Sequence, residues 1–501
     1  MLFGVNVRVV RIESTLMEFF TFLNNSCFFN VSISLISVYL LASICYGIHL
    51  SSTIEFAFPN LLNSFNSFSV FFLTSILFLF GFDISFLDAL YFFNLNFQLI
   101  FLIIVVLALF VSRDFLVARN INKYEYDILF TFVVLSSICL CFADDFLVLY
   151  LSIELLSLSF YVFATFHRNS EFSTEAGLKY FVFGGIISCF LLLGFSLIYL
   201  AFGSTTFELL FSLAFNNNDV FLFLGILFIL IALLFKVGSA PFHAWLCDVY
   251  DGSILSVTLL FASAPKIILF SVIVKLFFFA FIDYKDFWVP FFWIASTFSI
   301  AVGSISAIYQ KRIKRLFAYS TIAHTGFILL GVLACSVESS KALIFYITVY
   351  AFLTILLFSL LIFSTLKTTA YPKYLANLSS IGIKNYLFAI TFALILFSIA
   401  GIPPLAGFFS KFFVLFTIVA QQYYVTSLII IIISSVACFY YIRLIKIFFF
   451  VKSSKNSFWL SNTTKQNTEI VIGPLLFLNV CFFFRPDLLS HFSTVLGIIL
   501  F

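Results

Sequence analysis

The sequence predicts an all-α polytopic membrane protein, on the evidence of its composition and of its long apolar runs. Of the 501 residues, 63% are hydrophobic and only 10% are charged. Soluble domains carry about 25% charged residues. Most of the apolar runs are long enough to cross a bilayer, which takes about 20 residues in a helix. Because backbone polar groups in lipid must find partners within the protein, each run is predicted to be helical.

The apolar runs and the polar residues between them predict about 14 transmembrane helices. The second and fourth runs are short, and the first contains the polar stretch "NNSCFFN". The predicted spans are residues 19–48, 66–82, 95–118, 126–142, 145–167, 178–203, 219–246, 253–282, 288–309, 314–335, 340–366, 385–421, 423–452 and 469–485.

Lysines and arginines alternate between the loops as this number of spans requires. Most of them follow odd-numbered spans, as in "YQKRIKRLF" between the ninth and tenth. Positively charged loops stay on the side from which a membrane protein is inserted. The basic loops are therefore expected to face the matrix or cytoplasm, and both termini the opposite side.

Several ionisable residues remain within the predicted spans. Such a group costs about 2.5–3.5 kcal/mol on insertion scales, so it usually faces the bundle interior and marks an ion or proton path. The alternative is a static glutamate–lysine pair that only holds helices together. Lys275 and Arg443 lie near helix ends, where their side chains are expected to reach the membrane surface. The deeper residues are Glu154, Lys236, Lys266 and Lys411.

Helix-breaking residues accompany two of these lysines, in "LFKVGSAPFHAW" and "AGIPPLAGFFSKFF". Two broken helices five spans apart predict an inverted repeat, because an odd number of spans turns the second copy upside down. The repeats are predicted at residues 126–285 and 286–452. They follow an N-terminal three-helix segment, 1–125, and precede a loop, the last span and a tail, 453–501. The breaking residues are Gly238, Pro241, Pro403 and Pro404.

A buried lysine beside a helix break has suitable chemistry for proton transfer. Its protonation responds to a nearby charge, and Glu154 is the acid available at that depth. Broken turns free backbone carbonyls and admit water, which can carry protons between lysines. His324 is equally typical of a relay and of a hydrogen-bonded packing residue. The possible relay residues are Ser239, Tyr319, Ser320 and His324.

No cofactor is expected in this chain. The nine cysteines lack the spacing of a zinc or iron–sulfur site, and no nucleotide phosphate loop is visible. The small net charge of +4 does not indicate nucleic-acid binding. The N-terminus lacks the features of a signal or transit peptide. The bias towards phenylalanine, with 78 residues against 2 methionines, hints at an AT-rich organellar genome.

Five motifs, in order, resemble subunit 2 (bacterial subunit N) of respiratory NADH:ubiquinone oxidoreductase, complex I. This subunit belongs to a wider antiporter-like, proton-translocating family. The resemblance extends from about residue 126 to 450. Lys266, where subunits 4 and 5 usually have a histidine-bearing segment, distinguishes the chain from both, and a lysine rather than a glutamate at 411 also argues against subunit 4. The motifs are "EFSTEAGLKYFVFG", "LFKVGSAPFHAWLCDVYDGS", "FASAPKIILF", "KRLFAYSTIAHTGFILLG" and "SIAGIPPLAGFFSKFFVLF".

The resemblance implies roles for the buried charges. Glu154 would pair with Lys236, the lysine of the first half-channel. Lys266 would connect this half-channel to the second, which uses Lys411. The chain would be a subunit of a proton-translocating reductase without redox catalysis of its own, since NADH, flavin, iron–sulfur clusters and ubiquinone are bound by other subunits. Its neighbours would be subunits 4 and 4L and lipids, in the mitochondrial inner membrane rather than a bacterial plasma membrane. Both termini would then face the intermembrane space.

Two alternatives remain open. The chain could be a subunit of a multisubunit sodium/proton antiporter, which shares the glutamate–lysine pattern; Lys266 and the proteins that co-purify would separate the two. It could also be a helical scaffold without transport, in which case neutral replacements of all four buried charges would leave pumping intact.

Overall fold

The structure of the chain is a computed structural model, and its described part contains helices and no strand beyond isolated β-bridges. Nine of the described helices are long and apolar enough to cross a membrane. The predicted all-α polytopic fold is therefore confirmed. The predicted span at 66–82 and most of that at 19–48 lie outside the described residues, so the total of 14 stays a prediction. The described residues are 33–45, 47, 89–119, 121, 123–207, 209–210, 220–367, 373–379, 386–450, 467–482 and 486–499.

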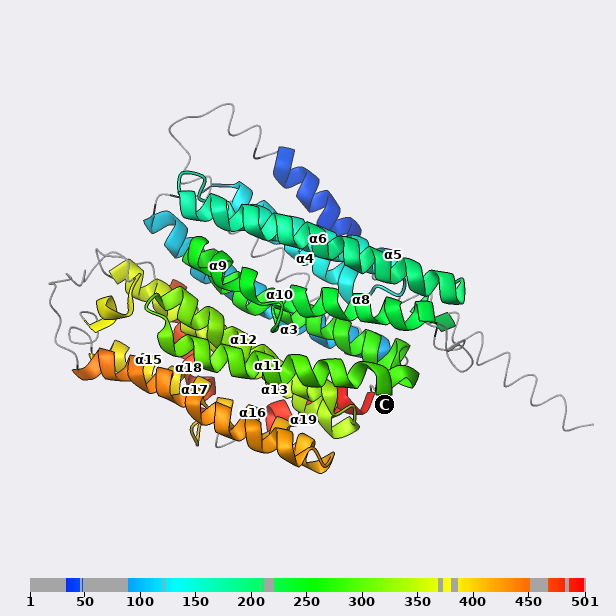
Figure 1. Cartoon of the computed structure of the whole chain (residues 1–501). Helices are drawn as coiled ribbons and strands as arrows, with labels where there is room; N and C mark the ends of the chain where they lie inside the picture. The colour runs from blue at the N-terminus through cyan, green and yellow to red at the C-terminus, as the bar shows by residue number, and fades with distance from the viewer. Residues whose placement is uncertain are drawn as a thin grey trace, which may run out of the picture.

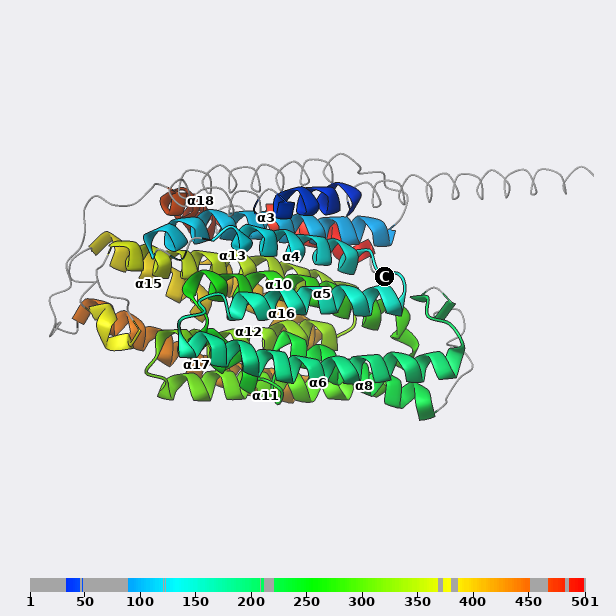
Figure 2. The same cartoon turned by 90° about the horizontal axis from the view of Figure 1, so that it is seen from above.

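The long helices run roughly parallel and form one elongated bundle (Figure 1). Seen from above, α3 and α18 lie along one long side of the bundle, and α6 and α11 along the other (Figure 2). The helices on which the bundle depends are α3 (Ala89–Ala118), α4 (Glu125–Cys141), α5 (Phe146–Ala164), α6 (Glu171–Phe202), α8 (Val220–Val237), α9 (Ala244–Gly252), α10 (Leu255–Lys275), α11 (Lys285–Tyr309), α12 (Ile313–Leu333), α13 (Val337–Lys367), α15 (Tyr386–Ala400), α16 (Ala406–Ala420), α17 (Tyr424–Phe450), α18 (Asn467–Cys481) and α19 (Asp487–Ile499).

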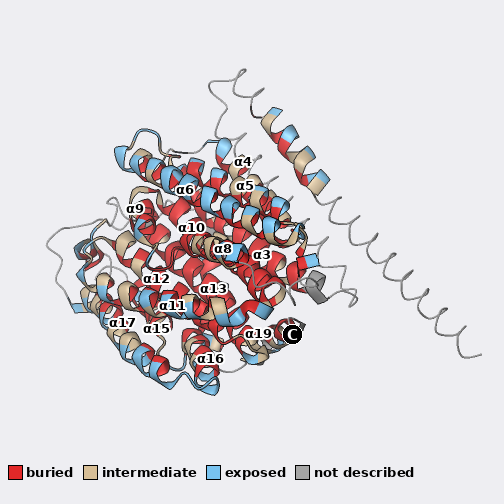
Figure 3. Ribbon diagram, turned by 45° about the vertical axis from the view of Figure 1, so that its right-hand side comes forward, coloured by how far each residue is buried: buried red, intermediate tan, exposed pale blue. Residues whose placement is uncertain are grey.

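Helices α10, α12 and α13 form the buried centre of the bundle (Figure 3). Every residue of α10 except Pro265 is buried. Peripheral helices such as α6 and α17 instead expose apolar side chains, among them Leu200 and Ile432. Lipid tails are as apolar as leucine, so such faces suit contact with lipid or with other membrane subunits.

The two predicted helix breaks share one backbone geometry. The first separates α8 from α9 at Gly238, and the second separates α15 from α16 at Gly401. These glycines have φ angles of 80° and 86°, in the left-handed region that glycine adopts without a steric penalty. Each breaking glycine donates its N–H to backbone carbonyls three and four residues earlier, at 2.9–3.1 Å. In both, a cis proline, Pro241 or Pro404, follows three residues after the glycine.

The broken helices run in opposite directions, as an inverted repeat requires. Asp251, near the end of α9, forms an ion pair with Arg312, which directly precedes α12. Arg312 also forms a β-bridge with Tyr374, in the link that leads into α15. The first broken helix thus ends, and the second begins, at the same end of the bundle. We call this the basic end, after Arg312, Arg315 and Lys179.

Several boundaries differ from the sequence prediction; helix α3, for example, begins at Ala89 rather than at residue 95. Helix α6 begins at Glu171 rather than at residue 178, because its polar first turns continue the helix beyond the apolar run. The predicted C-terminal tail contains helix α19, which packs on α13; there Ser340 Oγ donates to Gly497 O at 3.1 Å. With 13 residues, α19 is shorter than the roughly 20 residues that a helix needs to cross a bilayer.

Candidate functional site

Glu154 on α5 and Lys236 on α8 form an ion pair inside the bundle. Nζ of Lys236 lies 3.7 Å from Oε1 of Glu154, and their side chains are 6% and 22% exposed. This distance is longer than a hydrogen bond, and neither atom has a hydrogen-bond partner among the described residues. Ser157 donates to the other oxygen, Oε2 of Glu154, at 3.3 Å. The pair is close enough for strong coupling, although its two nearest charged atoms are buried without a hydrogen-bond partner among the described residues.

Other side chains cap the broken end of α8, next to Lys236. Trp245 Nε1 donates to Phe235 O at 3.1 Å, across the break from α9. Ser239 Oγ donates to Leu234 O at 3.0 Å. The hydroxyl group of Ser239, a predicted relay residue, thus donates to a backbone carbonyl in this structure.

A cavity joins Lys236 to Lys266. Its volume of about 30 Å³ is enough to hold water. Both lysines line it, and Ser157 and Tyr250 contribute polar groups. Tyr250 Oη has no hydrogen-bond partner among the described residues, which makes it available to cavity water.

Lys266 lies in the buried centre, directly after Pro265 in α10. It is 3% exposed and donates to Tyr350 Oη at 3.1 Å and to Thr321 O at 3.4 Å. No carboxylate pairs with it among the described residues. Unlike Lys236, it is held by neutral oxygens alone.

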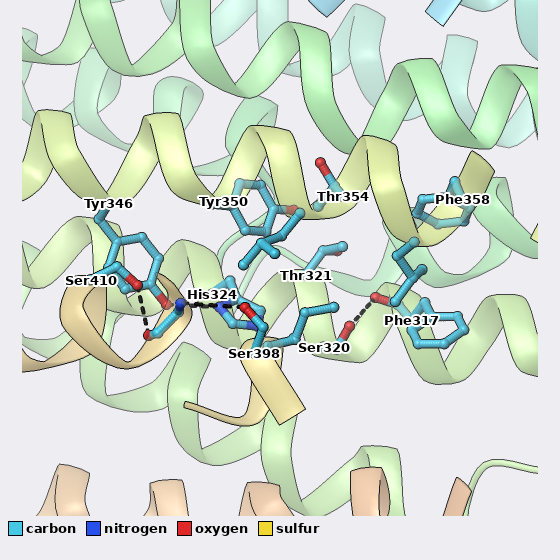
Figure 4. A pocket seen from close by; sticks show the side chains of 14 residues that line it. Phe317, Ser320, Thr321, His324, Tyr346, Tyr350, Thr354, Phe358, Ser398 and Ser410 are labelled. Atoms are coloured by element: carbon cyan, nitrogen blue, oxygen red, sulfur yellow. Dashed lines mark hydrogen bonds between the residues drawn. The ribbon is translucent and has the colours of Figure 1, made fainter. Parts of the chain in front are cut away.

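A second cavity, of about 20 Å³, lies on the far side of Tyr350. His324 is its central titratable group (Figure 4). His324 Nδ1 lies 2.7 Å from Tyr346 Oη, and Nε2 lies 3.4 Å from Tyr441 Oη. Both ring nitrogens therefore meet hydroxyl groups, an arrangement that fits a relay and a hydrogen-bonded packing residue alike. Besides the tyrosines, the other polar lining residues are Ser320, Thr321, Thr354, Ser398 and Ser410.

Lys411 reaches back across the second break. From α16 its Nζ donates to Ile399 O at 3.0 Å and to Ala400 O at 2.8 Å, the last carbonyls of α15. Ile399 also lines the second cavity. A Cβ atom on Gly401 would lie only 2.9 Å from Lys411 Cδ, so glycine leaves room for this lysine.

Two residues do not take the expected places. Tyr319 lies outside both cavities and faces His243, with 6.4 Å between ring centroids. The expectation that Lys275 reaches the membrane surface is wrong: it is 5% exposed and pairs with Asp144 Oδ1 at 2.9 Å. Arg443 is half-buried and donates to Ile308 O, next to the end of α11, at 2.8 Å, so its expected reach to the membrane surface stays a prediction.

The tyrosines around Lys266 and His324 were missed in the sequence. Each lies within an apolar run, among 22 tyrosines and 78 phenylalanines, so no local signal marks it. Their proximity arises only from the packing of α12, α13 and α17. The missed residues are Tyr346, Tyr350 and Tyr441.

Two discontinuous helices in inverted repeats, with buried lysines beside their breaks, define an antiporter-like membrane protein. A family model described as "NADH:quinone oxidoreductase/Mrp antiporter, TM" matches residues 143–439. The NADH-ubiquinone oxidoreductase chain 2 of Marchantia polymorpha is 34% identical over 75% of this chain and 76% of its own length. The NADH-quinone oxidoreductase subunit N of Rhodospirillum rubrum is 36% identical over 76% and 78%. The chain therefore belongs to the NADH:quinone oxidoreductase/Mrp antiporter family of membrane subunits, as its motifs predicted.

Solved structures share the fold. A chain of respiratory complex I from Thermus thermophilus matches with a TM-score of 0.74 and 24% identity, over 92% of this chain and 98% of that one. A chain of the archaeal membrane-bound sulfane sulfur reductase gives 0.78 and 19%, over 93% and 97%. A chain of the Mrp complex from a Dietzia species gives 0.75 and 17%, over 93% and 96%. At these identities the matches establish the fold alone.

Proposed function

We propose that the chain is the antiporter-like, proton-translocating subunit of a respiratory NADH:quinone oxidoreductase, complex I. One observation carries the proposal. Lys236 and Lys266 line one cavity, and Tyr350 joins Lys266 to a second cavity that reaches the end of α15, where Lys411 binds. Relatives named as chain 2 and subunit N of this enzyme support it.

The other membrane-arm subunits of the complex would be its partners, with subunits 4 and 4L as neighbours. The chain 2 relatives from Marchantia polymorpha and Oenothera berteroana favour a mitochondrial inner membrane. The basic end, with Arg312 and Arg315, would face the matrix. NADH, flavin, iron–sulfur clusters and ubiquinone would be bound by other subunits, so this chain would move protons without electron transfer of its own.

The Glu154–Lys236 pair would load the path. A carboxylate nearby stabilises the protonated lysine. A positive charge that neutralises Glu154 or draws it away therefore lowers the affinity of Lys236 for its proton. The proton then passes through water in the first cavity to Lys266. Neutral oxygens hold Lys266, so it can release the proton again without breaking an ion pair.

Lys411 would serve the second half of the path. Its ammonium group contacts Ile399 O and Ala400 O, and the carbonyl end of a helix favours a positive charge. A shift of α15 against α16 would change these contacts and with them the affinity of Lys411 for its proton. His324 and the serines of the second cavity would connect Lys266 to this group, while the predicted parts of Tyr319 and Ser239 remain proposals.

The test is proton pumping by the assembled complex in sealed vesicles. Lys236→Met and Lys411→Met should each lower the number of protons moved per NADH oxidised, with normal assembly. Lys341→Met is the matched control, because Lys341 pairs with the exposed Glu338 outside the path. Wild-type pumping by both path variants would refute the proposal.

A sodium/proton antiporter subunit is the second candidate, favoured by the family description and by the fold of the Mrp complex. Purification of the native assembly separates the two. NADH-oxidising subunits should co-purify with this chain; recovery with antiporter subunits alone would favour the alternative.

A further inference from the structure

We propose that Tyr350 is a relay residue that passes protons between the two cavities. This inference rests on the proposed function and adds a group to the path. Tyr350 belongs to α13 and is buried. Its oxygen contacts Lys266 at 3.1 Å, while its ring lines the second cavity (Figure 4).

The two cavities have no lining residue in common. Lys266 belongs to the wall of the first, and Tyr350 to the wall of the second. The contact between these two side chains is therefore a direct bridge from one cavity to the other. The other oxygen that accepts from Lys266 is Thr321 O, a backbone carbonyl. A carbonyl can accept a hydrogen bond but has no proton of its own to pass on, whereas a phenol can do both.

The transfer needs one rotation of the hydroxyl group. In the structure Tyr350 Oη accepts from Lys266 and donates to Ala262 O at 3.2 Å. Turning the O–H bond away from Ala262 O frees it for water in the second cavity. The ring centroid of His324 lies 5.4 Å from that of Tyr350. One cavity water can bridge the remaining gap.

The protons balance in a single concerted step. Lys266 gives a proton to Tyr350 Oη as the original hydroxyl proton leaves for the water. The water gives a proton to Tyr346 Oη, whose own hydroxyl proton moves to Nδ1 of His324. Lysine ends as the neutral amine, histidine as the imidazolium, and both tyrosines are unchanged. The hydrogen bonds of His324 to Tyr346 and Tyr441 keep its ring in place for this role.

Tyr350→Phe in the assembled complex tests the relay, because it removes one oxygen and keeps the ring. A positioned acid–base group contributes about 10²–10⁴-fold to the rate of proton transfer. We therefore expect the transfer rate to fall at least about tenfold, and NADH-driven pumping to fall with it. The double variant with Lys266→Met should pump no worse than Lys266→Met alone, since both act on one step. Tyr126→Phe is the control, a buried tyrosine on α4 that lines neither cavity.

The outcomes separate the relay from the proposed function. Wild-type pumping by Tyr350→Phe, with Lys266→Met defective, would overturn the relay and leave the proposed function standing. Wild-type pumping by Lys266→Met, Lys236→Met and Lys411→Met together would overturn the proposed function itself. If Tyr350→Phe fails to assemble, Tyr350→His carries the test: its ring nitrogen can relay, so pumping should persist, and an assembled but inactive Tyr350→His complex would overturn the relay.

Discussion

Lys411 Nζ lies 2.8 Å from Ala400 O, so a charged side chain of the second half-helix caps the carbonyl end of the first. In the first repeat, the indole N–H of Trp245 donates across the break to Phe235 O. The same backbone break is thus satisfied by a neutral donor in one repeat and by a titratable one in the other. Any conformational change at the second break must therefore alter the surroundings of a titratable group.

Replacement of Lys411 should separate capping from proton transfer. Lys411→Met removes the donors to two carbonyls, which costs about 1–3 kcal/mol for groups left unsatisfied, and it also removes the titratable group. Lys411→Arg keeps a donor and a charge but does not deprotonate in proteins. We expect Lys411→Met to lower both the thermal stability of the complex and its pumping, and Lys411→Arg to lower pumping alone. Pumping by Lys411→Arg at the wild-type rate would contradict this.

The breaking glycines should resist substitution. Gly401→Ala places a Cβ at a φ of 86° and 2.9 Å from Lys411 Cδ; left-handed backbone alone costs a residue with a side chain about 1–2 kcal/mol. We expect fewer assembled complexes on a native gel and a lower melting temperature. Gly185→Ala, on α6 with no atom within 4 Å of the new Cβ, is the control and should gain up to about 1 kcal/mol from helix propensity. Equal stability of the two variants would argue against a required left-handed break.

The ion pairs at the basic end should fix α9 against α12. Asp251 has a side chain only 9% exposed and pairs with Arg312 and with Arg315, the latter at 3.1 Å. Breaking a buried, multiply paired carboxylate costs about 3–5 kcal/mol, so Asp251→Asn should lower thermal stability clearly. The pair of the exposed Glu338 with the half-buried Lys341 should matter by about 0–1 kcal/mol. The measurement is the melting temperature of the complex, with Glu338→Gln as the control. Equal shifts in melting temperature for the two variants would contradict the prediction that the buried pair contributes more.

The ion pair of Lys275 and Asp144 should tolerate the loss of its exposed carboxylate. The lysine side chain is 6% exposed and the aspartate 81%, and Lys275 also donates to Ala143 O. Asp144→Asn therefore leaves the lysine a carbonyl partner and should cost less than about 1 kcal/mol. Asp144→Ala and Asp144→Asn should melt alike; a large loss in either would show that the carboxylate is needed to keep Lys275 charged in the protein interior.

The sequence was informative where a residue type conflicts with its surroundings. A lysine in an apolar run and a glycine or proline in a long helix are visible as exceptions, so Lys236, Lys411 and the breaks at Gly238 and Gly401 were predictable. Tyr350 is no exception in a run of aromatics, and its contact with Lys266 joins residues 84 positions apart. Such contacts follow from how α10 and α13 pack, which hydropathy does not encode. The burial of Lys275 was missed for the same reason: its partner lies on another helix junction.

The exchange of Lys236 for arginine tests the central claim most directly. Arginine preserves the positive charge beside Glu154, so it satisfies a static ion pair, but it does not release its proton. The measurement is the initial rate of NADH-driven proton uptake by sealed vesicles that contain the Lys236→Arg complex, normalised to the amount assembled. Uptake through a titrating lysine predicts normal assembly with uptake reduced at least severalfold. Normal assembly with a wild-type rate of uptake would contradict it and leave Lys236 as a structural charge.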